Sequence, residues 1–522
     1  MLNYDNFLKT TKAIVFAVCL LSCGFVFGQK EDYNWLVGYD SWAGYDTASQ
    51  HWFGITHFDF NQQQVSITRD SLGMNFNRSN SSISDTNGNL IFFCNGVTVR
   101  NWADQIMQNG DTLGAGYFLE QHNPNLLYFG LGYTQPHIVL TSPLENGLYD
   151  IFHSYTDTLV NDLDIYGKKL LRTSIDMKQN AGLGKVTVKD SIISTNENTF
   201  TVVATKHGNG KDWWVLTNRT RTNCYDLFLY DGSNSLVNKL ECGGSILPHG
   251  QICSMRFSTD GSKFVQASTT GHINVFDFDR CNGVLTLKED FIIQEVIDSS
   301  SSYWWPTGLE FSPDSRFFYV FCSARIYQFD TWANNIKNSR YQVAAYSGFL
   351  GPFQQTYFYA QLAPNGKIYT CSGNSNYYVG VIDNPNGQGS SCNFLDHNIQ
   401  VPTFITGLCY FPNYRLGALT GSPCDTLTGL NETARAEKEK ILKAYPNPAT
   451  DFVTVDYGFT DWNKGEVSLE ISNELGQTVT QQHLPMYSGF QKIDVSQFAA
   501  AVYHIYIKRN NAIIAAAKFS KL

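Results

Sequence analysis

Met255-Arg-Phe-Ser-Thr-Asp-Gly-Ser-Lys-Phe-Val265 is one copy of a short pattern that recurs along this chain. Two short apolar runs flank a turn in which Gly261 supplies the positive φ of a tight hairpin and Asp260 caps the turn with a side-chain hydrogen bond. The stretch therefore predicts a β-hairpin. Three other stretches follow the same plan, at residues 83–93, 309–319 and 361–369.

The hairpins recur along the chain as a loose, WD-like repeat. The last three lie about 50 residues apart, the period of a β-propeller in which each four-stranded blade buries its faces only against its neighbours. Strands of alternating apolar and polar residues follow them, as at residues 272–278 and 324–329. Further blades are predicted around residues 126–152 and 200–230, which predicts an all-β propeller of six or seven blades.

The two ends of the propeller are expected to meet. Residues 33–38 and 52–56 read as strands, and we predict that they share a blade with residues 408–411. Such sharing would bury the edge strands.

Composition supports an all-β protein and excludes some partners. Aromatic residues make up 14% of the 522 residues, charged residues only 16%, and there are 42 glycines, a mixture rich in strand and turn formers. The formal net charge of −9 is mild, and no run of Lys or Arg offers a footprint for nucleic acid or anionic lipid. We therefore predict no nucleic-acid partner.

Residues 1–28 are predicted to be a signal peptide. Two lysines precede an apolar run at residues 13–27, which is shorter than the roughly 20 residues of a membrane span with its flanks, and cleavage is predicted between Gly28 and Gln29. The alternative is a lipoprotein box in which Cys23 is acylated. No later segment is long and apolar enough to span a bilayer, so an extracellular or outer-membrane surface location is expected.

The cysteines favour neither a zinc site nor a redox motif. Two of the 12 lie in the predicted signal peptide, and the others include no C-x-x-C pair. In an exported protein some are expected to pair, with Cys392 to Cys424 or Cys409 as the first choice. At least half are expected to be small buried hydrophobic residues in strands, as Cys322 would be.

A second domain is predicted at the C-terminal end. The propeller would occupy residues 29–416, and residues 417–443 read as a linker because they are Gly-rich, then charged, with no alternating apolar face. Within residues 444–522, short strands separated by turn signals predict a small β-sandwich.

This C-terminal region also contains a set of recognisable motifs. They are Tyr445, Pro446, Asn447 and Pro448, then Gly476 in an Asn-Glu-Leu-Gly turn, Tyr503 in the penultimate strand, and the basic Lys518 and Lys521. Residues 444–522 thereby resemble the type A sorting domain of the type IX secretion system, with an ordinary stalk sandwich as the alternative. The resemblance implies the type IX secretion machinery as a partner and passage across the outer membrane, then release or surface attachment. Ala501 departs from the family, which usually has Gly there; the methyl group is harmless unless φ must be positive.

The preceding region resembles the propeller regions of large secreted Bacteroidetes proteins. The resemblance covers residues 30–415 and lies in the motifs at residues 84–90, 204–207 and 212–215 together with the Phe-Ser-x-Asp-Gly hairpins. It implies the fold and brings no assigned chemistry.

No catalytic motif is specific in this sequence. There is no H-E-x-x-H, G-x-S-x-G, phosphate loop or paired Cys set, so no catalytic residue, metal or cofactor is predicted. The oxygen ligands at residues 85–89 alternate as in a calcium loop, but Leu90 stands where Gly is needed, and a hairpin turn is favoured. His207 and His249 lie beside glycines in loops and are expected to be structural or solvent-facing.

The aromatic excess is the most suggestive feature for function. In the pairs Trp213–Trp214 and Trp304–Trp305, one ring must face opposite to its neighbour if the segment is a strand, so one of each could reach a ligand. Packing between blades is the favoured alternative. We therefore favour a propeller that binds protein or glycan over an enzyme. The alternative is a polysaccharide hydrolase that uses channel carboxylates.

Overall fold

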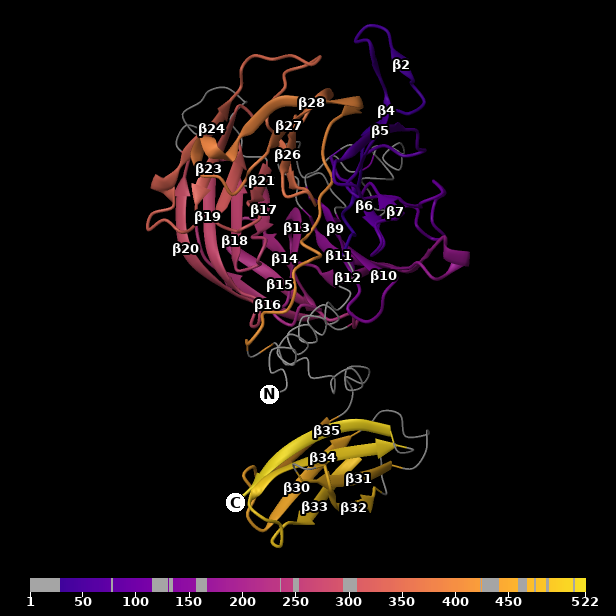
Figure 1. Cartoon of the computed structure of the whole chain (residues 1–522). Coiled ribbons are helices and arrows are strands. Elements are labelled where there is room, and N and C mark those ends of the chain that lie inside the picture. The colour runs from indigo at the N-terminus through magenta and orange to yellow at the C-terminus, as the bar shows by residue number, and fades with distance from the viewer. Residues whose placement is uncertain are drawn as a thin grey trace, which may run out of the picture. The chain divides into compact units, whose positions relative to one another are not determined.

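The computed structural model describes residues 29–76, 78–114, 130, 135–155, 167–234, 236–246, 253–293, 308–422, 424, 441–458, 467–473, 476–484, 488–509 and 512–522. It divides into two compact units, of which the first ends at Asp425 and the second begins at Thr426. Both are built from strands (Figure 1). The predicted signal peptide lies outside the described residues, among which no helix is long and apolar enough to cross a membrane.

The four hairpins predicted from the sequence all form. Each has one residue of positive φ in its turn, namely Gly88, Gly261, Ser315 or Gly366. The strand pairs are β6 Ser81–Ser84 with β7 Leu90–Cys94, β17 Cys253–Phe257 with β18 Lys263–Ser268, β21 Gly308–Phe311 with β22 Phe317–Phe321, and β25 Tyr359–Leu362 with β26 Ile368–Cys371.

Side-chain hydrogen bonds hold two of these turns in the same way. Ser258 Oγ accepts the N–H five residues further on at 2.9 Å, and the Asp260 carboxylate accepts the N–H two residues further on at 2.9 Å. In the next hairpin Ser312 and Asp314 make the same two contacts at 2.9 and 3.1 Å. The repeated Phe-Ser-x-Asp sequence is therefore a turn-forming unit.

Seven sheets make up the described part of the first unit, and they follow one another along the chain. The first contains β1 Asn34–Tyr39, β4 Gly54–Asp59 and β5 Ser66–Asp70, and the second contains β6, β7 and β8 Val99–Asn101. The third contains β9 His137–Thr141, β10 Leu148–Tyr155, β11 Lys169–Asp176 and β12 Lys185–Ser194, and the fourth contains β13 Asn198–Lys206, β14 Trp213–Arg219, β15 Cys224–Tyr230 and β16 Val237–Cys242. The fifth contains β17, β18, β19 His272–Asp279 and β20 Val284–Ile292; the sixth contains β21, β22, β23 Arg325–Asp330 and β24 Tyr341–Ala345; and the seventh contains β25, β26, β27 Asn376–Ile382 and β28 Phe394–Ile405. Three short 3-10 turns, Asn180–Gly182, Lys337–Ser339 and Gly389–Cys392, lie in the connections.

The sheets are arranged in a ring. Contacts link β1 to β6, β6 to β9, and then β9, β13, β17, β21 and β25 in succession, so the first strands of the blades lie side by side around a centre. The ring closes because β28 contacts both β1 and β4. The first unit is thus a β-propeller with seven blades among its described residues, which confirms the predicted class.

The closure of the ring differs from the prediction. The last blade is extended by β3 His51–Trp52 and β2 Tyr45–Asp46, and Trp52 pairs in parallel with Thr403 of β28. Residues 408–411 do not join a blade as a strand. The sequence Tyr410-Phe-Pro-Asn-Tyr414 explains this, because Pro412 has no N–H to donate and the aromatic rings do not alternate with polar residues.

The second unit consists of two antiparallel sheets around a separate apolar core. The first sheet contains β29 Ile441–Tyr445, β30 Phe452–Gly458 and β33 Ser488–Asp494, and the second contains β31 Val467–Ser472, β32 Thr478–His483, β34 Ala501–Arg509 and β35 Ala512–Lys521. Val453, Leu469 and Ile505 are among its fully buried side chains. This is the sandwich expected from the sequence.

The disulfides differ from the expected pairing. Cys224 bonds to Cys242 across β15 and β16, and Cys281 bonds to Cys424. Cys392 and Cys409, which we expected to pair with Cys424 or each other, are free and buried. Proximity of cysteines around a propeller depends on blade order, which spacing along the chain does not reveal. The predicted burial of Cys322 is confirmed.

Candidate site at the centre of the propeller

The chain that follows the seventh blade passes through the centre of the propeller. We call residues 408–416 the channel segment. In Figure 1 this orange part of the chain descends past β9 and β13. Cys409 lies against the carbonyl of Leu36 at 3.5 Å, and the Tyr414 hydroxyl donates to the carbonyl of Val139 at 2.7 Å. The channel segment thus contacts the innermost strands of different blades and fills the space between them.

Aromatic rings occupy most of this space. Tyr410, Phe411 and Tyr414 are buried, and the Tyr410 hydroxyl donates to the carbonyl of Met255 at 3.3 Å. The Phe411 ring lies 6.2 Å from that of Trp35 in the first blade. Burial of a side chain of this size contributes about 1.5–3 kcal/mol to stability, so the segment is firmly held.

A buried ion pair joins the channel segment to three blades. Arg256 of β17 contacts the Glu310 carboxylate of β21 and donates to the Gln361 side chain at 3.0 Å and to the Phe411 carbonyl at 3.0 Å. Glu310 also accepts the N–H groups of Leu362 at 2.8 Å and of Phe311 at 2.9 Å. Burial raises the pKa of Glu310, while Arg256 opposes this shift.

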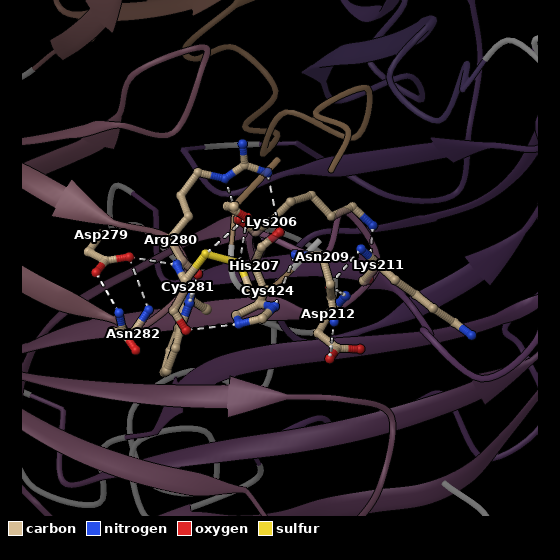
Figure 2. Close-up of a disulfide and its surroundings, with 12 residues drawn as sticks. Lys206, His207, Asn209, Lys211, Asp212, Asp279, Arg280, Cys281, Asn282 and Cys424 are labelled. Atoms are coloured by element: carbon tan, nitrogen blue, oxygen red, sulfur yellow. Dashed lines mark hydrogen bonds between the residues drawn. A yellow bond between two sulfur atoms is a disulfide. The ribbon is translucent and has the colours of Figure 1, made fainter. Parts of the chain in front are cut away.

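The channel segment is fixed again where it leaves the propeller. Arg280 donates to the carbonyl of Gly417 at 2.6 Å and to that of His207 at 3.2 Å. The disulfide between Cys281 and Cys424 then ties the chain to the fifth blade, beside the loop that carries His207 (Figure 2).

His207 also helps to hold the loops around this disulfide. Its Nδ1 accepts the N–H of Asn209 at 3.2 Å, and its Nε2 lies 3.0 Å from the carbonyl of Cys281, to which it donates (Figure 2). Both ring nitrogens are therefore engaged in holding loops, as expected for a structural histidine. His249 lies outside the described residues.

A pocket of about 250 Å³ opens beside the channel segment. The turns of the fifth, sixth and seventh blades form its rim, through Thr259, Pro313 and Pro364. The channel segment forms its floor together with polar side chains from the blades. The charged and amide residues that line it are Asp32, Arg256, Glu310, Gln361, Asn413 and Arg415.

Both carboxylates that line this pocket are paired with arginines. Glu310 contacts Arg256, and Asp32 accepts two hydrogen bonds from Arg415 at 2.5 and 2.8 Å. A glycosidase needs one carboxylate free to accept or donate a proton and another to act on water or on the sugar. Neither is free in this pocket. Among the described residues, no group of three or more His, Cys, Asp or Glu side chains could hold a metal ion.

Trp213 and Trp214 are both buried. The Trp213 indole donates to the carbonyl of Thr141, at 3.0 Å, and that of Trp214 to the carbonyl of Arg280, at 2.7 Å, so the rings do face opposite ways. Neither ring is open to a ligand, because both faces of this strand are covered by neighbouring blades, and the packing interpretation accounts for both. Trp304 and Trp305 lie outside the described residues.

The loop at residues 85–89 is a hairpin turn. Asp85 Oδ1 accepts the N–H groups of Asn87 at 2.8 Å and of Asn89 at 2.9 Å, and these contacts lower the pKa of Asp85, which burial would raise. Its carboxylate is thus used within the turn.

The motif residues of the second unit come together from both of its ends. Asn447 Oδ1 accepts the N–H of Ser520 at 2.9 Å, and its Nδ2 donates to the carbonyl of Lys518 at 3.4 Å. Tyr503 stacks on Phe519 with the ring centres 5.5 Å apart.

The other motif residues hold turns or face solvent. Gly476 has φ of +77° and donates its N–H to Asn473 at 2.9 Å. Tyr445 and Lys518 are exposed, and Pro446 and Pro448 follow cis peptide bonds. Ala501 opens β34 and pairs with Lys521 as an extended residue, so glycine is not needed there.

One family model matches within the second unit. Residues 443–520 match the family described as the secretion system C-terminal sorting domain. No curated protein matches the chain. Among solved structures, a candidate 6-phosphogluconolactonase from Bacteroides uniformis shares 13% identity over 72% of this chain and 98% of its own, with a TM-score of 0.42.

Two other solved structures are similar at the same low level. The periplasmic gluconolactonase PpgL from Pseudomonas aeruginosa shares 12% identity over 72% of this chain and 99% of its own, with a TM-score of 0.36. The β-propeller domain of Cps50 (Swd1) from Myceliophteria thermophila shares 11% identity over 61% of this chain and 85% of its own, with a TM-score of 0.34. The propeller assignment therefore rests on the sheets of this chain itself.

The chain is a β-propeller protein whose centre is filled by its own polypeptide. Its second unit is a C-terminal sorting domain of the type IX secretion system, which implies a secreted or cell-surface protein and the secretion machinery as its partner.

Proposed function

We propose that this chain is a secreted or cell-surface propeller that binds a protein or glycan ligand without cleaving it. Its export would depend on the sorting domain, with residues 29–416 as the binding domain, residues 417–443 as the linker, residues 444–522 as the exported tail and cleavage near Gly28. The observation that carries the proposal is the pocket beside the channel segment. It is concave, partly aromatic and supplied with fixed polar groups.

The paired carboxylates favour binding over hydrolysis. Glu310 and Asp32 are held by Arg256 and Arg415, which keeps them from acting as a general acid and base. The Asn413 amide is held by a 2.7 Å hydrogen bond to the carbonyl of Thr259, and its second N–H suits recognition of a ligand hydroxyl or peptide carbonyl. The alternative, a polysaccharide hydrolase with channel carboxylates, would need one of these ion pairs to open.

A pocket-filling variant tests the proposal. Pro364 is half-buried at the pocket rim, in a turn closed by a 2.9 Å hydrogen bond from the Gly366 N–H to the Ala363 carbonyl. We expect Pro364→Trp to fill the pocket and weaken retention on the bound polysaccharide or protein about ten-fold or more. Unchanged retention by Pro364→Trp would contradict a role for the pocket.

The chain offers a matched control. Thr86 occupies the same position of the equivalent turn in the second blade, where the Gly88 N–H donates to Asp85 at 2.9 Å, and it does not line the pocket. Thr86→Trp should therefore leave retention unchanged.

A further inference from the structure

Three exposed aromatic rings lie on the hairpin formed by β2 and β3. Trp42 is 76% exposed, Tyr45 45% and Trp52 41%. Residues 29–76 are all described, and within them these three are the exposed large apolar side chains, with no aliphatic one among them. We call residues 42–52 the aromatic hairpin.

The aromatic hairpin lies on the opposite face of the propeller from the pocket. β1 begins beside Asp32, which lines the pocket, and runs across the first blade to Tyr39, after which the hairpin follows. A strand of six residues spans about 20 Å. The hairpin and the pocket are therefore separate sites. Figure 1 shows the hairpin projecting at β2, beyond the strands of the last blade.

The rings of Tyr45 and Trp52 are held in fixed positions. Tyr45 pairs with Trp52 across the hairpin, with the ring centres 5.1 Å apart at 65°, and the Arg69 guanidinium lies 4.0 Å from the centre of the Trp52 ring. A cation at this distance over an indole is attracted by the ring electrons and orients both side chains.

The hairpin is also anchored to the last blade. The Nε2 atom of the buried His51 lies 2.9 Å from the carbonyl of Val401. The His51 ring packs 4.0 Å from that of Tyr377. A platform fixed in this way loses little conformational entropy when a ligand binds.

Polar side chains surround the rings. Asp46 accepts the N–H groups of Ala48 at 3.2 Å and Ser49 at 3.1 Å, which sets the direction of its carboxylate, and Arg69 and Asp70 are exposed on β5. The surface therefore combines flat apolar rings with fixed donors and acceptors. The centre of a protein–protein interface is instead depleted in Asp, of which this surface carries two.

We propose that the aromatic hairpin binds carbohydrate. Trp42 and Tyr45 stack on the C–H faces of pyranose rings, Asp46 accepts hydrogen bonds from the sugar hydroxyls, and Arg69 donates hydrogen bonds to them. The negative face of an aromatic ring attracts the partly positive C–H groups of a sugar. This inference rests on the binding role proposed above and adds to the pocket a second surface, on the opposite face, whose ligand is a glycan.

The test is affinity electrophoresis of the full chain in gels that contain β-glucan, xylan, mannan, pectin or chitosan, one at a time. We expect at least one polysaccharide to retard the chain, and Trp42→Ala and Tyr45→Ala each to weaken that retardation about ten-fold or more. Trp102→Ala, which removes an indole of 57% exposure from the second blade, should change nothing. An unchanged melting temperature shows that the variants fold.

The outcomes separate the two proposals. Retardation by none of the polysaccharides, or retardation that Trp42→Ala and Tyr45→Ala leave intact, overturns the carbohydrate role of the hairpin. If Pro364→Trp abolishes binding while the hairpin variants retain it, the pocket proposal stands and the hairpin inference fails. If Trp42→Ala and Tyr45→Ala lose binding while Pro364→Trp retains it, the hairpin inference stands and the pocket proposal fails.

Discussion

Arg415 donates two hydrogen bonds to Asp32, at 2.5 and 2.8 Å, and so ties the end of the channel segment to the residues just before the first strand. The two residues are 383 positions apart. The ring of blades is therefore closed twice, once at the edge between Trp52 and Thr403 and once at the centre.

The central closure predicts a loss of stability in Asp32→Asn. Asp32 is buried, and its variant leaves Arg415 without its charged partner, so we expect the free energy of unfolding to fall by about 1.5–3 kcal/mol in urea denaturation. The exposed pair of Glu145 and Lys178 provides the control. Glu145→Gln should change the free energy by less than about 1 kcal/mol, and an equal effect of both variants would argue against a special role for Arg415.

The buried pair of Arg256 and Glu310 predicts a strongly non-additive cycle. Arg256→Met leaves the Glu310 carboxylate buried without its partner and should cost about 3–5 kcal/mol. The double variant Arg256→Met with Glu310→Gln should regain much of this loss, because no unpaired charge remains. Denaturant unfolding of all four proteins measures the coupling, and simple additivity would contradict the pairing.

The disulfide between Cys281 and Cys424 should stabilise the propeller more than the other one. It closes a loop with a sequence separation of 143, against 18 for Cys224 and Cys242, and loop entropy favours the longer loop. We expect replacement of the first pair by serine to cost about 2–5 kcal/mol. Thermal unfolding of both paired Cys-to-Ser variants tests this, and a larger loss for the shorter loop would refute it.

Lys206 predicts a specific pH dependence. Burial lowers its pKa to about 8, although Glu31 and Asp212 act in the opposite direction. Between pH 8 and about 10.5 Lys206 holds its proton in the unfolded chain and has lost it in the folded chain. The free energy of unfolding therefore rises as pH rises through this window and falls as pH falls through it.

The matching variant is Lys206→Met. Its gain in stability over the wild type should shrink by up to about 1.4 kcal/mol per pH unit as pH rises across the window. Urea unfolding at several pH values measures the difference between the two proteins, which removes the effect of other titrating groups. A difference that stays constant with pH would contradict the lowered pKa.

The hairpins could be predicted because their determinants are local. Gly261 and Asp260 fix a turn through φ and one side-chain contact, both of which can be read within a few residues. The motifs of the sorting domain could be recognised for the same reason. The regular spacing of the hairpins along the chain then predicted a propeller.

The centre of the propeller could not be predicted, because its contacts join distant blades. Residues 408–411 looked like a strand, whereas their partners are Leu36, Met255 and Gln361, hundreds of positions apart in some cases. The pairing of Cys281 with Cys424 was missed for the same reason, because these residues are also far apart in the sequence.

The exposure of the aromatic residues could be predicted only in part. Trp213 and Trp214 face opposite ways and are both buried, as the favoured packing interpretation expected, because a strand inside a propeller is covered on both faces. The exposed rings of Trp42 and Tyr45 lie on a two-residue strand and its approach, too short to show alternation.

The claim that this propeller binds without cleaving is tested most directly by incubating the purified chain with insoluble polysaccharides and immobilised proteins, and recording retention and released fragments in the same samples. We predict retention on at least one material with no soluble fragments. Released sugars or peptides would contradict the account and show that the paired carboxylates Glu310 and Asp32 separate during a reaction.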